Sequence, residues 1–362
     1  MPLTSELIVC ITSSALFDCS EAHEIWKRDG LVAYQAHHCE RLMVPLKPGV
    51  GFPLVQSLLA LNNISGKNLV DVVLISRIDG ESGERVRNSI IHHDLSIRRM
   101  SFTAGTDVIK YLTAWKCDLF LSTEEEQVRA VLHTANSLMF EGIAAGLVYD
   151  RKIESTSTQL SPLSSEMEKQ ASKSISTLID ATRWPEDQVR IAFDGDGVLF
   201  SDEAERVFRE HGLMAFNLSE QDKEHIPLSK GPMHKFALKI QKIRSELGPD
   251  QNWRIRTFLV TARAKETTKR VYTTLKEWDL DIDEKHFLGG LNKTPFLRII
   301  DPAIFFDDSS VHIERAKQYV PSAHVIYSTK NSRNNTLTSE STPQLTAAND
   351  NENLNVMDRN QM

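Results

Sequence analysis

Residues 190–208 read RIAFDGDGVLFSDEAERVF, in which a short apolar run ends in two carboxylates, Asp194 and Asp196, and a helix-like segment follows. Two neighbouring carboxylates repel each other, so their place directly after an apolar run requires a chemical reason. In open α/β sheets, functional groups gather at the carboxyl ends of the strands. The stretch therefore predicts a buried strand with a polar site at its end.

Similar apolar runs alternate with amphipathic segments along the rest of the chain. Examples are VDVVLIS (70–76), CDLFLS (117–122), RTFLVTA (256–262) and AIFFDD (303–308). Strands that alternate with helices form βαβ units and a mainly parallel sheet. The sequence therefore predicts an α/β protein with Rossmann-like architecture.

The chain also contains an internal repeat. LFDCSEAHEIWKRDGLVAYQ from Leu16 matches LFSDEAERVFREHGLMAFN from Leu199. Four further pairs of segments match in the same order along the chain. Chance similarity of strand and helix patterns hardly explains five matches in series. We therefore predict two tandem Rossmann-like domains, residues 1–150 and 186–329, joined by a serine-rich connector at 151–185. The polar residues 330–362 cannot offset their ordering entropy and are expected to form a disordered tail.

The second copy carries polar residues at three strand ends and just before the third strand. They are Asp194 and Asp196, Thr261-Ala262-Arg263, Asp307-Asp308, and Lys293. A parallel sheet brings neighbouring strand ends together, and carboxylates gathered in this way require a cation. Oxygen ligands without a nearby cluster of histidine or cysteine favour Mg²⁺ over zinc.

The same residues have the chemistry for phosphoryl transfer. A carboxylate can attack phosphorus and form an aspartyl-phosphate, which makes Asp194 the candidate nucleophile. Asp196 is the candidate general acid and, later, general base. The hydroxyl of Thr261 and the ammonium of Lys293 are suited to hold the phosphate oxygens as charge develops.

Each of these residues taken alone has an ordinary explanation. Asp-Gly-Asp is common in turns, a threonine is common in strands, and a lysine is usually solvated. Arg263 either binds substrate or pairs with a carboxylate, and the arginine at the matching position of the first copy, Arg77, favours the structural role. The four groups together, in order along the strands, favour a catalytic site.

These motifs carry a family resemblance. FDGDGV resembles the DxDx[T/V] pattern of the haloacid dehalogenase-like phosphohydrolases, and the three other groups match the remaining motifs of that superfamily in order. IAFDGDGVLFSDEAE, FLVTARA and IFFDDSSVHIE further resemble the cytosolic 5'-nucleotidase type I family, as do SSALFD, VVLISR and DLFLS in the first half. The resemblance covers nearly the whole chain except the connector and the tail.

The resemblance implies a cytoplasmic, Mg²⁺-dependent hydrolase of nucleoside 5'-monophosphates such as AMP. The implied catalytic residues are Asp194, Asp196, Thr261 and Lys293. The implied substrate-binding residues are Thr261, Ala262, Arg263 and Lys293. The implied metal ligands are Asp194, Asp196 through its backbone carbonyl, Asp307 and Asp308. A small cap is expected at about 201–254, where LSKGP (228–232) either contacts the nucleoside or forms a turn that starts a helix.

The first copy lacks the reactive groups. In the sequence match, Ile11 and Ser13 stand opposite Asp194 and Asp196, Val108 stands opposite Lys293, and Ser122 and Thr123 stand opposite the two later aspartates. The first copy is therefore predicted to be non-catalytic, as a scaffold, part of the substrate pocket or an effector site. Its remaining hydroxyls are expected to be isolated groups at the rim.

Composition limits the classes of partner. The formal net charge of −7 argues against nucleic acid or an anionic membrane surface as a partner. No apolar run approaches the roughly 20 residues that span a bilayer, and the four cysteines are expected to be reduced thiols. A phosphatase for another small phosphoester and a nucleotide-binding regulatory protein remain alternatives. A nucleotide effector and a homo-oligomer are left open.

Overall fold

The computed structural model describes residues 6–133, 142–149, 184–185 and 187–327. The first half contributes strands β1 (Leu7–Ile11), β2 (Val70–Ser76), β3 (Arg99–Phe102), β4 (Leu119–Ser122) and β5 (Ala144–Val148). The second half contributes β6 (Val189–Phe193), β7 (Ile255–Thr261), β8 (Glu284–Phe287), β9 (Ile304–Asp307) and β10 (Ser322–His324). The predicted tail and nearly all of the predicted connector lie outside the described residues.

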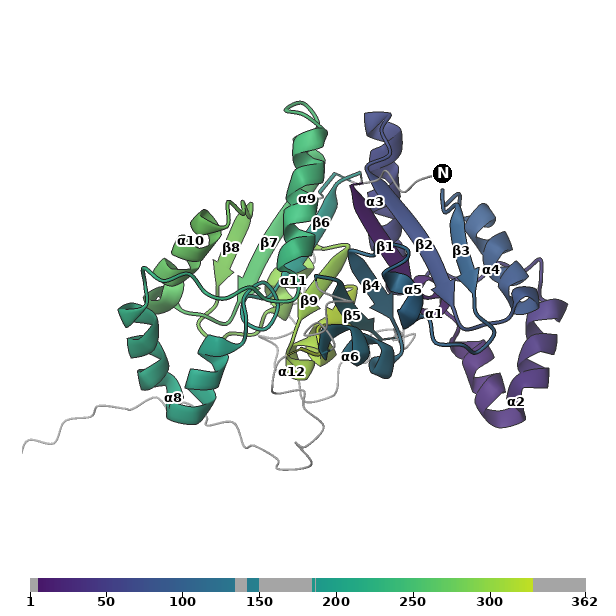
Figure 1. Ribbon diagram of the computed structural model, residues 1–362, viewed down its shortest axis with the longest axis horizontal. Coiled ribbons are helices and arrows are strands. Elements are labelled where there is room, and N and C mark those ends of the chain that lie inside the picture. Colours follow the sequence, from purple (N-terminus) through teal and green to yellow (C-terminus); the bar gives the residue numbers. More distant parts are fainter. Residues whose placement is uncertain (1–5, 134–141, 150–183, 186, 328–362) are drawn as a thin grey trace, which may run out of the picture. The chain divides into compact units, whose positions relative to one another are not determined.

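These strands form one ten-stranded sheet in the order β3-β2-β1-β4-β5-β10-β9-β6-β7-β8 (Figure 1). The neighbours pair in parallel except β5 and β10, which pair antiparallel. The central strands are apolar and buried on both faces, as in parallel sheets that helices cover on both sides. The predicted α/β class with a mainly parallel sheet is confirmed.

The two halves have the same strand order when each is counted from its own first strand. The first half has the order β3-β2-β1-β4-β5, and the second half has β8-β7-β6-β9-β10, which is the same order when β6 is counted as the first strand. An internal repeat predicts this agreement. The halves share a single sheet because β5 pairs with β10, with Ala323 opposite Val148 and His324 opposite Leu147. This pairing removes two exposed sheet edges.

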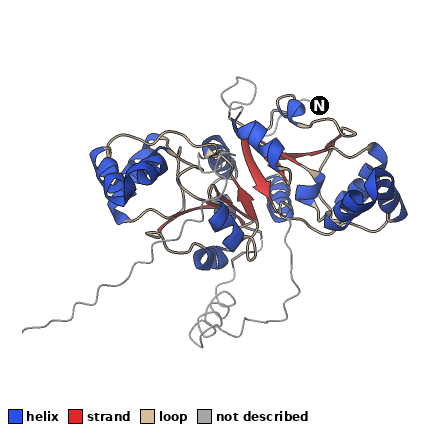
Figure 2. Cartoon of the chain, turned by 90° about the horizontal axis from the view of Figure 1, so that it is seen from below, coloured by secondary structure: helices blue, strands red, loops and turns tan. Residues whose placement is uncertain are grey.

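The helices follow the same plan and lie on both sides of the strands (Figure 2). The first half has α1 (Ser13–Leu16), α2 (Ser20–Glu40), α3 (Phe52–Ser65), α4 (Gly80–His92), α5 (Ile109–Leu112) and α6 (Glu125–His133). The second half has α8 (Glu203–Asp222), α9 (His234–Glu246), α10 (Thr268–Glu277), α11 (Thr294–Ile300) and α12 (Ser310–Ala316), with short 3₁₀ turns η2 (Asn252–Arg254) and η3 (Lys265–Thr267).

Helices α2 and α8 are each broken by a glycine with positive φ. Gly30 has φ of 82° and Gly212 has φ of 79°, a backbone conformation that side chains with a Cβ rarely adopt. The range predicted as a cap, 201–254, holds both α8 and α9. Helix α8 contacts η3 and α10 above the strand ends of the second half, whereas α9 contacts β1 and β5 of the first half.

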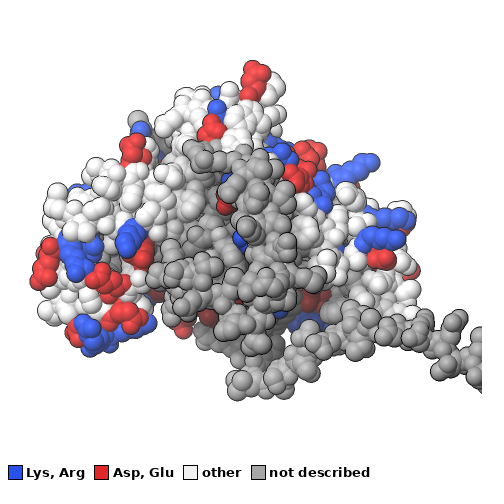
Figure 3. Space-filling model, turned by 180° about the vertical axis from the view of Figure 1, so that it is seen from behind, with Lys and Arg blue, Asp and Glu red and all other residues white. Residues whose placement is uncertain are grey.

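Two surface properties complete the description. Within the described residues, no helix is long and apolar enough to span a membrane. On the face in Figure 3, the described lysine and arginine side chains are interspersed with aspartate and glutamate.

Candidate active site

Lys293 lies between two buried carboxylates at the ends of neighbouring strands. Asp194 directly follows β6, Asp307 is the last residue of β9, and β6 pairs with β9. The Lys293 Nζ lies 2.7 Å from Oδ1 of Asp194 and 2.7 Å from Oδ2 of Asp307. Lys293 is 1% exposed, Asp194 7% and Asp307 0%. The structure thus brings together three of the residues that the sequence assigned to one site.

Burial and charge set the protonation of this group. Burial raises the pKa of Asp194 to about 6, with Lys293 opposing the rise and Asp307 adding to it. Burial alone would raise the pKa of Asp307, but the Lys293 ammonium and His312 outweigh it and hold that pKa well below its usual range. Burial disfavours the charged form of Lys293, yet the two carboxylates raise its pKa above the usual value. The lysine therefore stays charged between its partners.

His312 is a site residue that the sequence analysis missed. Its Nδ1 lies 3.1 Å from Oδ2 of Asp307, whose other oxygen, Oδ1, accepts a hydrogen bond of 2.8 Å from the backbone N–H of Ser309. The sequence excludes only a cluster of histidine and cysteine and gives this single histidine no role. His312 could have been found from its spacing, because it lies five positions after Asp307. At that spacing it falls in the first turn of α12, close to the end of β9.

The carboxylates of this group suit a hard divalent cation. One ligand atom each from Asp194, Asp307 and His312 lie within 4.8 Å of one another. Asp308 is also buried, and a Cβ at Gly197 would lie 2.7 Å from its carboxyl carbon, so glycine lets the loop after Asp194 approach this second aspartate. The carboxylates of Asp194 and Asp307 against one lysine leave a net negative charge, which a cation bound by oxygen ligands would offset.

The predicted hydroxyl lies beside the same loop. Thr261 ends β7, which pairs with β6, and it is 1% exposed. A Cβ at Gly195 would lie 3.2 Å from the Thr261 Oγ1, so the hydroxyl is next to the residue that follows Asp194. Ala262 is exposed, and its backbone carbonyl accepts a hydrogen bond of 2.9 Å from Gly290 N–H.

Asp196 is held by Arg263. The Nε and Nη2 of Arg263 each donate a hydrogen bond of 2.7 Å to the two carboxylate oxygens of Asp196. The third nitrogen, Nη1, pairs with Glu220 of α8. Of the two roles weighed for Arg263, pairing with a carboxylate is the one seen here, and a contact with substrate stays a prediction. The match with Arg77 is one of residue type only, because Arg77 is half-exposed and pairs with Glu124.

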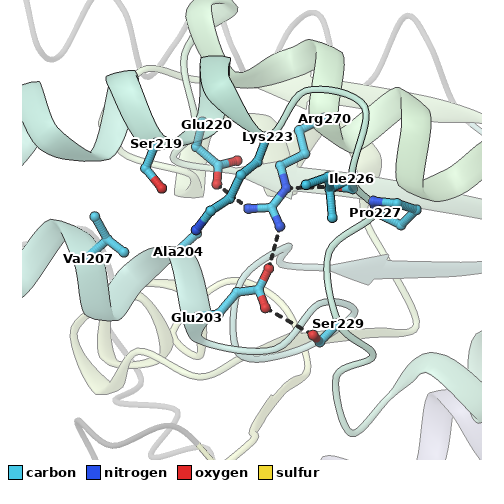
Figure 4. Close-up of a pocket in the computed structure, with 10 residues that line it drawn as sticks. All are labelled: Glu203, Ala204, Val207, Ser219, Glu220, Lys223, Ile226, Pro227, Ser229 and Arg270. Carbon is cyan, nitrogen blue, oxygen red and sulfur yellow. Dashed lines mark hydrogen bonds and ion pairs between the residues drawn. The ribbon is translucent and has the colours of Figure 1, made fainter.

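A cavity of about 230 Å³ lies against helix α8 (Figure 4). Its lining includes Glu203, Glu220 and Arg270, together with Ser229 from the LSKGP segment. That segment precedes α9, and Gly231 N–H donates a hydrogen bond of 2.8 Å to the Leu199 carbonyl. A Cβ at this glycine would lie 2.4 Å from two backbone oxygens, which explains the glycine on packing grounds.

The first half places hydroxyls where the second half has carboxylates. Thr12 N–H bonds to the Leu121 carbonyl as Asp194 N–H bonds to Phe306, so Thr12 and not Ile11 occupies the position of Asp194. The sequence match was shifted by one residue because the following loop is one residue shorter. The conclusion that the first half lacks the acidic groups is unchanged.

The expectation that these hydroxyls are isolated rim groups is wrong. Ser13 Oγ lies 2.7 Å from Ser76 Oγ, and both side chains are buried. Ser122 Oγ donates a hydrogen bond of 2.9 Å to the Gln127 side chain, and Ser14 Oγ lies 2.6 Å from Thr123 Oγ1. Hydrogen bonds among hydroxyl and amide side chains stand here in place of the charged group of the second half, and Gln127 Nε2 also donates to Oε2 of Glu124 at 3.1 Å.

We expect replacement of Lys293 by methionine to destabilise the fold. Methionine has a similar length but leaves Asp194 and Asp307 buried without their shared cation. Breaking a buried ion pair from one side costs about 3–5 kcal/mol, so urea unfolding should show a loss of that size. Lys269→Met, at an exposed pair with Glu224, is the control and should change stability by about 0.5 kcal/mol or less. Equal stability of the two variants would contradict the bridging role.

Comparison with known proteins identifies the family. The family model described as 5'-nucleotidase matches residues 1–161 and 167–332. A human (Homo sapiens) protein named cytosolic 5'-nucleotidase 1B is 33% identical over 323 residues, which are 86% of this chain and 47% of that relative. The chain thus spans about half the length of this relative. No solved structure was found to match. Because the family model matches both halves, including every residue of the site around Lys293, the chain belongs to the 5'-nucleotidase family.

Proposed function

We propose that this chain is a Mg²⁺-dependent 5'-nucleotidase that hydrolyses nucleoside 5'-monophosphates, with AMP-like substrates, to nucleoside and phosphate. The observation that carries the proposal is the Lys293 ammonium held between Asp194 and Asp307 at adjoining strand ends. Membership of the 5'-nucleotidase family and the name of the human relative support the choice of substrate.

The proposed hydrolysis runs in two chemical steps, formation of an aspartyl-phosphate and its hydrolysis. An Asp194 oxygen attacks phosphorus and forms an aspartyl-phosphate while the bond to the nucleoside O5' breaks, and Asp196 gives that oxygen a proton. Asp196 then takes a proton from water, whose oxygen attacks phosphorus and releases phosphate and the Asp194 carboxylate. The charged Lys293 and the Thr261 hydroxyl would hold phosphate oxygens as charge develops. A contact of Ala262 or Arg263 with the substrate remains part of the proposal.

Asp194, Asp307, Asp308 and the backbone carbonyl of Asp196 are the proposed Mg²⁺ ligands. The buried carboxylates supply the oxygen donors, and Asp307 has a neighbouring His312 that helps to fix its orientation. When bound, the ion would offset the negative charge of these groups and of the phosphate.

The two halves are proposed as tandem haloacid dehalogenase-like domains, with residues 1–150 non-catalytic and residues 186–329 catalytic. The shared strand order supports this division. Helix α8 is the proposed cap, because it contacts η3 and α10 next to the strand ends, whereas α9 lies against the strands of the first half. A cytoplasmic location stays a prediction, and a nucleotide effector and a homo-oligomer stay open.

Phosphate release from a panel of substrates tests the proposal. Purified protein with Mg²⁺ is given nucleoside 5'-monophosphates, nucleoside 3'-monophosphates, sugar phosphates and p-nitrophenyl phosphate. The highest kcat/KM is expected for a nucleoside 5'-monophosphate. A preference for sugar phosphates would overturn the substrate class but keep the phosphatase, and no turnover of any ester would favour a nucleotide-binding regulatory protein.

Removal of the metal should abolish turnover. We expect excess chelator to stop phosphate release and added Mg²⁺ to restore it, because the carboxylates otherwise repel the phosphate. Thermal unfolding in chelator is the control, since the Lys293 bridge holds the strand ends together without a metal. Full activity in chelator would contradict the metal assignment.

A further inference from the structure

A chain of buried and partly buried ion pairs leads from Asp196 to helix α8. Glu220, on the last turns of α8, is 2% exposed and pairs with both Arg263 and Arg270. Arg270 Nη1 lies 2.7 Å from Oε1 of Glu220, and its Nη2 lies 2.6 Å from Oε1 of Glu203 at the start of the same helix (Figure 4). Both ends of α8 are therefore tied to one arginine, and one end is tied through Arg263 to Asp196.

The geometry makes the orientation of Asp196 depend on Glu220. The guanidinium of Arg263 is planar and rigid, and all three of its nitrogens are used, two on Asp196 and one on Glu220. Arg263 is 4% exposed, and its guanidinium carbon lies 5.5 Å from the centroid of the Phe216 ring of α8. A change at Glu220 therefore moves or loosens the group that fixes the Asp196 carboxylate.

The first half offers an internal comparison. Arg85 occupies the position of Arg270, and its Nε donates to the Val44 carbonyl as Arg270 Nε donates to the Ile226 carbonyl, at 3.0 and 2.8 Å. The residue at the position of Glu220, counted from the glycine that breaks each helix, is His38. Its two buried ring nitrogens have no hydrogen-bond partner among the described residues. The arginine and its bond to a backbone carbonyl therefore occur in both halves. At the position of Glu220, the buried glutamate occurs in the half that has Asp196.

We propose that Glu220 and Arg263 are positioning residues that hold the Asp196 carboxylate in the orientation from which it serves the leaving group, and that they tie this orientation to helix α8. The inference rests on the proposed function, in which Asp196 is the general acid. The cavity beside α8 is not needed as a ligand site, because Glu203, Glu220 and Arg270 in its lining bond to one another and to Ser229.

Leaving-group dependence separates positioning from a merely structural role. A nucleoside leaves as an alkoxide and needs a proton, whereas p-nitrophenolate is a stable anion and needs little help. A general acid contributes about 10²–10⁴-fold. We expect Asp196→Asn to lose on the order of 100-fold more kcat/KM on AMP than on p-nitrophenyl phosphate. Glu220→Gln disturbs the same proton donor indirectly, so its loss of kcat/KM should be about 10-fold larger on AMP than on p-nitrophenyl phosphate.

Two further variants make the test decisive. Glu210→Gln makes the same chemical change at an exposed position of α8 and should match the unmodified protein on both substrates. Glu220→Gln leaves two buried guanidinium groups with one counter-charge fewer, so its thermal unfolding is measured. If it does not fold, Glu220→Asp, which keeps the charge but shortens the side chain, replaces it and should show the same selective loss.

The outcomes distinguish this inference from the proposed function. If Asp196→Asn loses equally on both substrates, the general-acid role fails and the positioning inference fails with it. If Asp196→Asn shows the selective loss but the folded Glu220 variants lose nothing, or lose equally on both substrates, the positioning inference alone is overturned. A selective loss in both supports it.

Discussion

Replacement of Asp194 by asparagine is expected to lower turnover by several orders of magnitude while the protein stays folded. The amide cannot attack phosphorus, and loss of a covalent nucleophile generally removes most of the rate enhancement. Asparagine keeps the shape of the side chain and an oxygen that can accept the hydrogen bond from Lys293, which retains Asp307 as a charged partner. Phosphate release and thermal unfolding measure the two effects separately.

An exposed aspartate supplies the control for this variant. Asp301 pairs with Arg190 at the surface, and its left-handed backbone conformation, with φ of 46°, is one that asparagine tolerates. Asp301→Asn should leave turnover unchanged. A structure of the unmodified protein with the phosphate mimic beryllium fluoride should place that group on Asp194. Near-normal turnover by Asp194→Asn would end the assignment of the nucleophile.

The residues that the sequence placed correctly are those that follow strands. Asp194, Thr261 and Asp307 each stand at a strand end, and neighbouring parallel strands bring such positions together whatever the loops do. Lys293 joins them from the segment before β9, where it is the N-cap residue directly before α11. Periodicity and order along the chain therefore contain enough information to assemble this part of the site.

The residues that the sequence missed lie on helices. Glu220 belongs to an amphipathic helix, and from the sequence alone this helix cannot be told from one exposed to solvent. The burial of Glu220 depends on two arginines that are distant in the sequence. The single sheet was also not predicted, since the β5–β10 pairing joins Ala144–Val148 to a three-residue strand. Neither contact is local, so no periodicity in either segment reports it.

The second large effect is the asymmetry of the two halves. Asp307→Ala combined with Asp308→Ala is expected to abolish Mg²⁺-dependent turnover, because it removes two proposed metal ligands and one partner of Lys293. The matched change in the first half is Ser122→Ala combined with Thr123→Ala. Both pairs end the equivalent strands β9 and β4, so they differ in the chemistry removed and not in their place in the fold.

The structure predicts that the matched variant is less stable than the unmodified protein. Ser122 is fully buried and bonds to Gln127, and Thr123 bonds to Ser14, so truncation leaves polar partners behind. Each buried partner left unsatisfied costs about 1–3 kcal/mol, and urea unfolding should show a loss in that range. The basal kcat of the folded protein should remain unchanged, since no charged group of the site is touched. If the first half binds an effector at these strand ends, activation by added nucleotide is lost while the basal rate stays. A large loss of basal kcat in folded Ser122→Ala, Thr123→Ala protein would instead show that the first half takes part in the chemistry.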